Sequence, residues 1–91
     1  MRFEWDEDKR RTNIVKHGID FLDAEAVFNG HTVTLEDTRW AYGEHRFVTF
    51  GLLQGEVVAV VHTESEDVIR IISMRRASRH EERSYRREIR D

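Results

Sequence analysis

The stretch at residues 45–75 reads HRFVTFGLLQGEVVAVVHTESEDVIRIISMR. Apolar and polar side chains alternate through much of it, and a period of two is typical of β-strands. We expect three strands, at His45–Leu53, Glu56–Glu64 and Asp67–Arg75. The pairs Gln54-Gly55 and Ser65-Glu66 fall between these runs as two-residue hairpin turns. The chain therefore carries an antiparallel meander at its centre.

The two turns also predict the register of the strands. With these loops Phe47 lies opposite His62, and His62 lies opposite Ile69. One face of the sheet then holds Val48, Phe50, Leu52, Ala59, Val61, Arg70 and Ile72. The other face holds Phe47, Thr49, Val60, His62, Ile69, Ile71, Ser73 and Arg75. Both faces are largely apolar, so we expect both to be covered. The polar members of the second face would line an open patch made of His62, Thr49, Ser73 and Arg75.

Two helices are expected before the meander. The first spans Asp6–His17, with acidic residues at its positive N-terminal end and Gly18 as a left-handed C-cap. Its thin apolar face is formed by Ile14 and Val15. The second runs from Phe21 to about Phe28, where large apolar residues recur at helical spacing.

A last helix and shorter elements complete the pattern. Ser78 and Glu81 form a capping box that opens a helix running to about Arg90. The apolar stripe of this helix is poor, mainly Tyr85 and Ile89. We also expect a polar loop at Asp37–Gly43. Two short strands are expected at His31–Leu35 and Arg2–Trp5, the second of them at a sheet edge. The predicted fold class is α+β: two N-terminal helices, a central mostly antiparallel β-sheet of three to five strands, and a C-terminal helix.

The length and composition limit the class of protein. The chain has 91 residues, which is room for one domain, so residues 1–91 are taken as a single domain. It contains no cysteine, which excludes disulfides and thiol nucleophiles. No apolar run approaches about 18 residues and no secretory leader is visible, so we expect a cytoplasmic protein that does not meet the membrane.

The charge is distributed unevenly along the chain. The net charge is −3, yet residues 70–91 carry eight Arg against four acidic residues, a local charge of +4. Residues 1–69 carry seven basic and fourteen acidic residues, a local charge of −7. Arginine binds phosphate or carboxylate groups through two hydrogen bonds, so this segment indicates an anionic partner. The simpler explanation is a solvated helix with many ion pairs.

No metal-binding or nucleotide-binding motif is present. The sequence lacks His-Glu-x-x-His, an EF-hand loop and a glycine-rich phosphate loop, so no metal or cofactor is expected. The remaining candidates are Lys16, His17, His62, Glu64, Arg70, Arg75, Arg76 and Arg79. RNA cleavage without a metal needs a base for the 2′-hydroxyl, cations for the charged phosphorane and an acid for the leaving 5′-oxygen. These residue types supply all three.

Each candidate also has a structural explanation. His17 and Lys16 lie at a helix end, where they would interact with the last carbonyls and the helix dipole. His62 fits a hydrogen-bonded core histidine, and Arg70 fits a buried partner of an acidic residue. Trp40, in the polar loop, is placed to stack on RNA bases. Composition alone leaves ribonuclease as one option among several.

Several segments together resemble a known family. They are Phe3-Glu4-Trp5-Asp6, Lys16-His17-Gly18, the helix residues Phe21, Ala24 and Phe28, Gly43-Glu44-His45-Arg46, Thr63-Glu64, and Arg70-Ile71-Ile72-Ser73-Met74-Arg75-Arg76-Ala77 with Glu82 and Tyr85. In this order, over nearly the whole chain, they resemble the BrnT-like toxins, a branch of the RelE/ParE superfamily. The Lys-His-Gly and Arg-Ile-Ile-Ser-x-Arg segments are the most specific. Met74 is a small departure, since the pattern usually has Ala there.

The resemblance implies a RelE-like fold and a bacterial type II toxin. Such a toxin would be a metal-independent endoribonuclease that arrests growth until an antitoxin neutralises it. The alternative is a non-catalytic protein-interaction module of the same fold. The implied partner is a BrnA-like antitoxin with a ribbon-helix-helix DNA-binding part. Two toxins and two antitoxins would form a heterotetramer that meets operator DNA only through the antitoxin.

The matched segments and the chemistry together predict the site. The catalytic candidates are His17, Arg70 and Arg76, followed by Lys16, Glu64 and His62. The RNA-binding candidates are Arg75, Arg79 and Trp40. An acidic, amphipathic segment of the antitoxin is expected to cover Arg83, Tyr85, Arg86 and Ile89.

Overall fold

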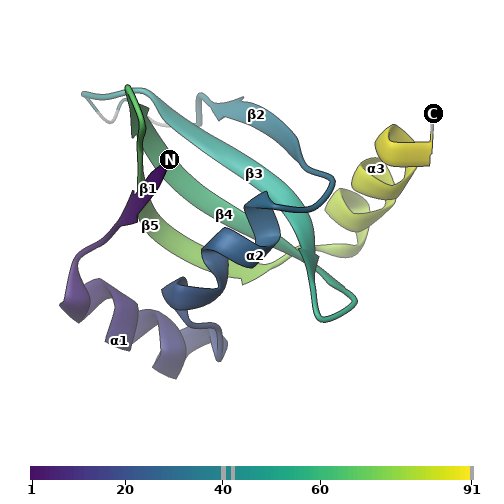
Figure 1. Cartoon of the computed structure of the whole chain (residues 1–91). Helices are drawn as coiled ribbons and strands as arrows, with labels where there is room; N and C mark the ends of the chain where they lie inside the picture. The colour runs from purple at the N-terminus through teal and green to yellow at the C-terminus, as the bar shows by residue number, and fades with distance from the viewer. Residues whose placement is uncertain (40, 42, 91) are drawn as a thin grey trace.

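Five strands form one curved, mixed sheet in the computed structural model, which describes residues 1–39, 41 and 43–90 (Figure 1). Their order across the sheet is β1-β5-β4-β3-β2. The strands are β1 (Arg2–Glu4), β2 (Val33–Asp37), β3 (Arg46–Leu53), β4 (Glu56–Ser65) and β5 (Val68–Arg76). β1 runs parallel to β5, and every other neighbouring pair is antiparallel. The predicted α+β class and the mostly antiparallel sheet are confirmed.

The first hairpin has the predicted loop and register. Gln54 and Gly55 have φ values of 51° and 83°, the left-handed pair that a type I′ turn needs, and Phe47 lies opposite His62. The predicted loop of the second hairpin is wrong by one residue. Strand β4 continues to Ser65, which pairs with Val68, and the loop is residues 66–67. His62 therefore faces Ile71 and not Ile69.

A β-bulge changes the second half of β5. The register shifts between Val61 and His62, so that Val61 faces Ser73 and Ala59 faces Arg75. A bulge adds one residue to one strand, which turns the following side chains to the opposite face. The prediction that Ser73 and Arg75 share the face of His62 is therefore wrong. Met74 takes the core position instead and is fully buried.

The N-terminal helices begin and end at clear capping residues. Helix α1 (Glu7–His17) starts behind Asp6, whose carboxylate accepts from the backbone N–H groups of residues 8 and 9. It ends at Gly18, which has the left-handed φ of 70° that the C-cap requires. The second predicted helix consists of a short 3₁₀ turn (Phe21–Asp23) followed by helix α2 (Ala24–Phe28).

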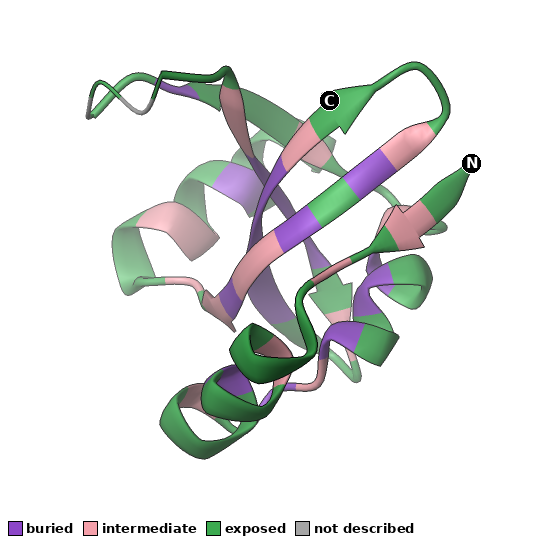
Figure 2. Cartoon of the chain, turned by 90° about the vertical axis from the view of Figure 1, so that its left-hand side faces the viewer, coloured by how far each residue is buried: buried purple, intermediate pink, exposed green. Residues whose placement is uncertain are grey.

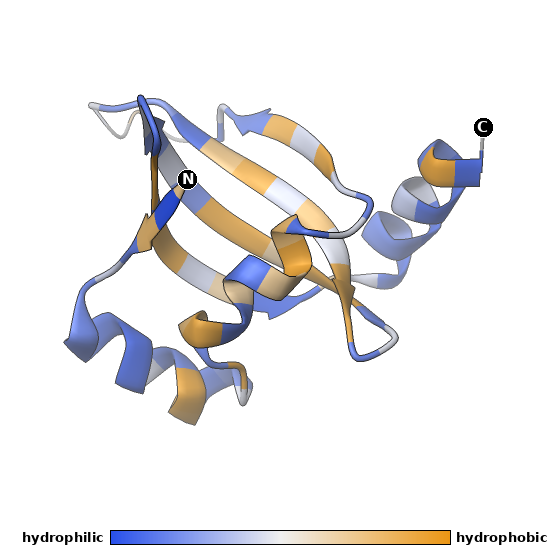
Figure 3. Ribbon diagram, viewed as in Figure 1, coloured by the Kyte–Doolittle hydropathy of each residue, from blue (hydrophilic) through white to orange (hydrophobic). Residues whose placement is uncertain are grey.

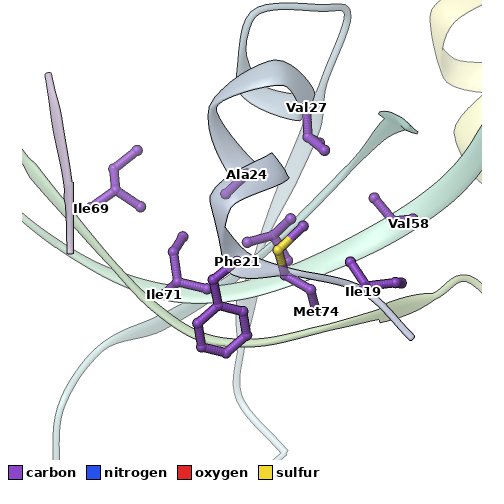
Figure 4. Close-up of a cluster of buried hydrophobic side chains, with 9 residues drawn as sticks. Ile19, Phe21, Ala24, Val27, Val58, Ile69, Ile71 and Met74 are labelled. Atoms are coloured by element: carbon purple, nitrogen blue, oxygen red, sulfur yellow. The ribbon is translucent and has the colours of Figure 1, made fainter. Parts of the chain in front are cut away.

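The main core lies between the sheet and the segment 19–28, which includes α2 (Figure 4). It contains Ile19, Phe21, Ala24, Val27, Val58, Val60, Ile69, Ile71 and Met74. Gly51 on β3 lets α2 approach closely, because a Cβ there would lie 2.7 Å from Cγ1 of Val27. Figure 2 shows the buried residues concentrated along the strands and on the inner sides of the helices.

Helix α1 contacts the sheet through an amide and not through the predicted apolar face. Ile14 and Val15 point outward, with 38% and 88% of their surface exposed. Asn13 is buried instead. Its Nδ2 donates to the carbonyls of Ile19 and Met74, both at 2.9 Å, and its Oδ1 accepts from the N–H of Met74 at 3.1 Å. Strand β1 pairs only with residues 68–70, so Asn13 binds the edge of β5 as a further strand would.

Helix α3 (Arg79–Arg90) covers part of the opposite face of the sheet. The predicted capping box is present: Ser78 N–H donates to Glu81 Oε1, and Glu81 N–H donates to Ser78 Oγ. Arg75 holds the same carboxylate at 2.8 and 3.1 Å. Tyr85 is buried against a second apolar cluster of the sheet, and its hydroxyl donates to the carbonyl of His31 at 2.6 Å. The rest of α3 extends beyond the sheet and is mainly hydrophilic (Figure 3).

Candidate functional site

A cleft of about 340 Å³ opens between α1 and the free edge of β5. We call it the edge cleft. It is lined by Asp8, Lys9, Thr12, Asn13, Lys16, His17, Ile72 and Ser73. The volume falls in the size range of small-molecule sites. The lining combines two lysines, two hydroxyls and one imidazole with the carboxylate of Asp8, and its cations can bind a phosphate group.

The local structure explains why these side chains meet. Residues 9, 12, 13 and 16 are spaced by three and four, so they lie on one face of α1. Asn13 at the middle of this face fixes the helix to the edge of β5, as described above. Ile72 is the extra residue of the bulge, since Val61 pairs with Ser73 and His62 pairs with Ile71. The bulge therefore places Ile72 and Ser73 together at the floor of the cleft.

Arg76 lies next to the His17 corner of the edge cleft. Its Nη1 donates to the backbone carbonyl of His17 at 2.9 Å, and its Nε donates to Glu56 at 3.0 Å. The side chain is 56% exposed, so a ligand can reach the guanidinium. Three of the six predicted catalytic residues, Lys16, His17 and Arg76, thus gather at the C-terminal end of α1.

His62 lies elsewhere and is enclosed. It is 0% exposed, packed against the rings of Phe28 and Phe47. Its Nε2 is 2.7 Å from the hydroxyl of Thr49, which is also fully buried. The predicted open patch of His62, Thr49, Ser73 and Arg75 is therefore wrong, because its first two members are fully buried and Phe28 of α2 packs on His62.

The environment of His62 favours the neutral imidazole. Burial lowers its pKa, and the nearby carboxylate of Glu64 opposes this effect only in part. Glu64 Oε2 lies 3.6 Å from His62 Nδ1, beyond hydrogen-bonding distance, so Nδ1 has no hydrogen-bond partner among the described residues. Glu64 itself is exposed. His62 and Glu64 therefore lie together on β4 within the sheet, and neither lines the edge cleft.

The remaining predicted residues are dispersed. Arg70 is exposed and lies 3.6 Å from Glu4, so the buried ion pair considered for it is not found. It lies six positions before Arg76 along β5, about 20 Å at 3.3 Å per residue. Arg75 holds Glu81 and lowers the pKa of that carboxyl to about 2. Trp40 lies outside the described residues.

The residues predicted on α3 divide between its two sides. Arg79, Arg83 and Arg86 are exposed, and Ile89 is 38% exposed. Tyr85 is only 2% exposed, because it packs on the sheet of its own chain. The side chain predicted as an apolar contact for the antitoxin is therefore packed within its own chain.

Sequence reasoning missed Lys9 and Thr12 among the lining residues of the edge cleft, as well as Asp8, Asn13 and Ile72, and it assigned Ser73 to a different patch. A signal was present for the first two, because polar residues recur at helical spacing on α1. A search for apolar stripes on a helix does not detect this pattern of polar residues. Across the described residues, no group of three or more His, Cys, Asp and Glu side chains is arranged to hold a metal ion. Within the same residues, no helix is both long and apolar enough to cross a membrane.

Comparison with known proteins gives one family match. Residues 5–81 match the family described as the ribonuclease toxin, BrnT, of type II toxin-antitoxin systems. The match includes α1, the whole meander and the first turn of α3, and so every residue that lines the edge cleft. No curated protein is similar enough to be matched.

Proposed function

Because the chain belongs to the BrnT family and is a ribonuclease toxin of a type II toxin–antitoxin system, we propose that it cleaves RNA in the edge cleft without a metal ion. The observation that carries the proposal is that Lys16 and His17 line an open cleft while Arg76, beside it, donates to the backbone carbonyl of His17. The family description also favours a ribonuclease over the non-catalytic module.

The residues of the edge cleft match the steps of the reaction. His17 takes the proton from the 2′-hydroxyl, whose oxygen then attacks the adjacent phosphorus. Lys16 and Arg76 bind the phosphate oxygens as negative charge builds up in the transition state. The bond from phosphorus to the 5′-oxygen breaks, that oxygen takes a proton from solvent water in the open cleft, and His17 then returns its proton to the solvent. The products are a 2′,3′-cyclic phosphate and a free 5′-hydroxyl, so atoms and protons balance.

Cleavage of RNA by the purified protein is expected to continue in excess EDTA. The physical reason is that protein cations supply the charge stabilisation that a metal would otherwise provide. Product ends identified by mass spectrometry should carry a 2′,3′-cyclic or 3′-phosphate, and DNA of the same sequence should stay intact because it lacks the nucleophile. Activity that disappears with EDTA and returns with magnesium would contradict the proposal.

The family also implies an antitoxin partner. We propose a BrnA-like protein with a ribbon-helix-helix part, assembled as two toxins and two antitoxins and reaching operator DNA through the antitoxin alone. An amphipathic acidic segment would bind α3 beside Ile89, whose apolar side chain is exposed, with Arg86 one helical turn away as its charged contact. Residues 6–28 carry six acidic against four basic residues, so they attract such a segment less than residues 70–91 with their charge of +4.

Hydrogen exchange on the free and bound toxin tests this surface. Amides within residues 67–90 are expected to gain protection in the complex, because a segment that folds on binding excludes water from the helix it covers. Amides within residues 6–28 should change little. Protection confined to residues 6–28 would mean that the antitoxin binds at α1 and α2 instead.

A further inference from the structure

The five arginines of α3 lie on one side of the helix. At 100° per residue, Arg79, Arg83, Arg86, Arg87 and Arg90 fall within an arc of about 100°. The three glutamates of α3 lie outside this arc, and Tyr85 points in the opposite direction, toward the sheet. We call this row of five residues the arginine stripe. It is about 16 Å long, with one or two guanidinium groups in each helical turn.

The charges of the arginine stripe are largely uncompensated. All five residues are exposed. Among the described residues only Arg86 has a carboxylate partner, Glu82 at 3.0 Å. The alternative considered from the sequence, a helix with many ion pairs, therefore does not describe this side of α3. Like charges at this spacing repel one another, which disfavours the helix unless an anion binds.

A groove of about 300 Å³ runs along the stripe and is lined by Arg83, Arg86, Arg87 and Arg90 alone. From this groove we infer that α3 binds the phosphate backbone of single-stranded RNA, independently of base sequence. Arginine pairs with phosphate through two hydrogen bonds. The lining has no aromatic ring and no side-chain amide, the groups that stack on bases or read their edges. It also has no apolar side chain, since Ile89, the anchor proposed for the antitoxin, lies outside the groove.

The position of the stripe suits a substrate that continues into the edge cleft. Arg79, at the start of the stripe, is three residues after Arg76, so their Cα atoms are at most about 11 Å apart. RNA bound along α3 thus arrives at the corner formed by Arg76 and His17. The acidic remainder of the chain, −7 over residues 1–69, repels RNA and directs it to this end of the molecule. The inference rests on the proposed function for its choice of RNA as the anion.

The affinity of the arginine stripe for RNA can be measured separately from catalysis with a 2′-O-methyl oligoribonucleotide. This RNA lacks the attacking hydroxyl and is not cut. The test variant is Arg83→Gln with Arg87→Gln, two residues on the side of α3 away from Ile89. Fluorescence anisotropy at several salt concentrations gives the slope of log K against log salt. Each lost contact with a single-stranded phosphate reduces that slope by about 0.7, so the double variant should lose about 1.4. Its affinity should fall about tenfold at low salt.

The matched control is Arg2→Gln with Arg11→Gln, which removes the same charge from exposed positions on β1 and α1. It should keep the wild-type slope. An equal loss in both double variants, or a wild-type slope in the stripe variant, overturns the inference. The inference is also overturned if the stripe variant binds this RNA normally but no longer binds the antitoxin. That result would assign the groove to a protein partner. If RNA binding depends on the arginine stripe but the wild-type protein cuts no RNA, the inference stands. The proposed cleavage is then refuted instead.

Discussion

Replacing His17 with alanine is expected to lower the rate of RNA cleavage by about 10²–10³-fold, since this is the usual contribution of one acid–base group. The fold should be unaffected. The bond from Arg76 to residue 17 uses the backbone carbonyl, which alanine retains, and the imidazole lines an open cleft. Single-turnover cleavage of a labelled RNA, with a thermal melt of the same preparation, measures both quantities.

His45→Ala is the matched control. His45 is exposed, pairs with Glu36 at 2.8 Å, and lies in the strand region away from α1. This variant should cleave RNA at the wild-type rate. If His17→Ala also cleaves at that rate while melting normally, the edge cleft is not the catalytic site, although the chain remains a member of its family.

Asn13→Asp is expected to destabilise the protein by roughly 3–4 kcal/mol, with a fall in Tm of about 15–25 °C. The side chain keeps its shape, so no cavity forms. A carboxylate cannot donate to the carbonyls of Ile19 and Met74, and it brings a negative charge against both oxygens. The loss should shrink as the pH is lowered toward about 4, where a protonated carboxyl regains one donor.

Asn29→Asp provides the comparison for this stability measurement. Asn29 is exposed and follows α2, so the same chemical change there meets water and should cost at most about 0.5 kcal/mol. Calorimetry or circular dichroism melts of the two variants across the pH range give the result. Equal Tm values for both variants would show that the amide of Asn13 does not hold α1 to the sheet.

The elements of the fold were largely predictable because their signals are local. Alternation identified β3, β4 and β5, and the capping box placed the start of α3 at its observed residue. The bulge was not predicted, although the sequence indicates it. Apolar residues follow at positions 69, 71, 72 and 74, where strict alternation would put an apolar residue at 73. The predicted register contained no bulge, and it therefore placed Arg75 on the wrong face of the sheet.

The candidate site was less predictable because its residues come from distant segments. His17 and Arg76 were identified from their chemistry and the family resemblance, yet only the tertiary structure shows that they meet. The same criteria selected His62 and Arg70, which the fold places in the core and on the far part of β5. The contact that builds the edge cleft is made by a buried amide, and patterns of hydrophobicity carry no information about it.

The pairing of β1 and α1 with β5 determines when the edge cleft can form during synthesis of the chain. One wall of the edge cleft comes from residues 8–17 and the other from residues 72–73, with Arg76 beside them. A nascent chain emerges with its N-terminal end first, so α1 has no strand edge to bind until β5 has left the ribosome. Contacts across such a long separation in sequence also form late in folding. Incomplete translation products that stop before β5 therefore lack one wall of the edge cleft.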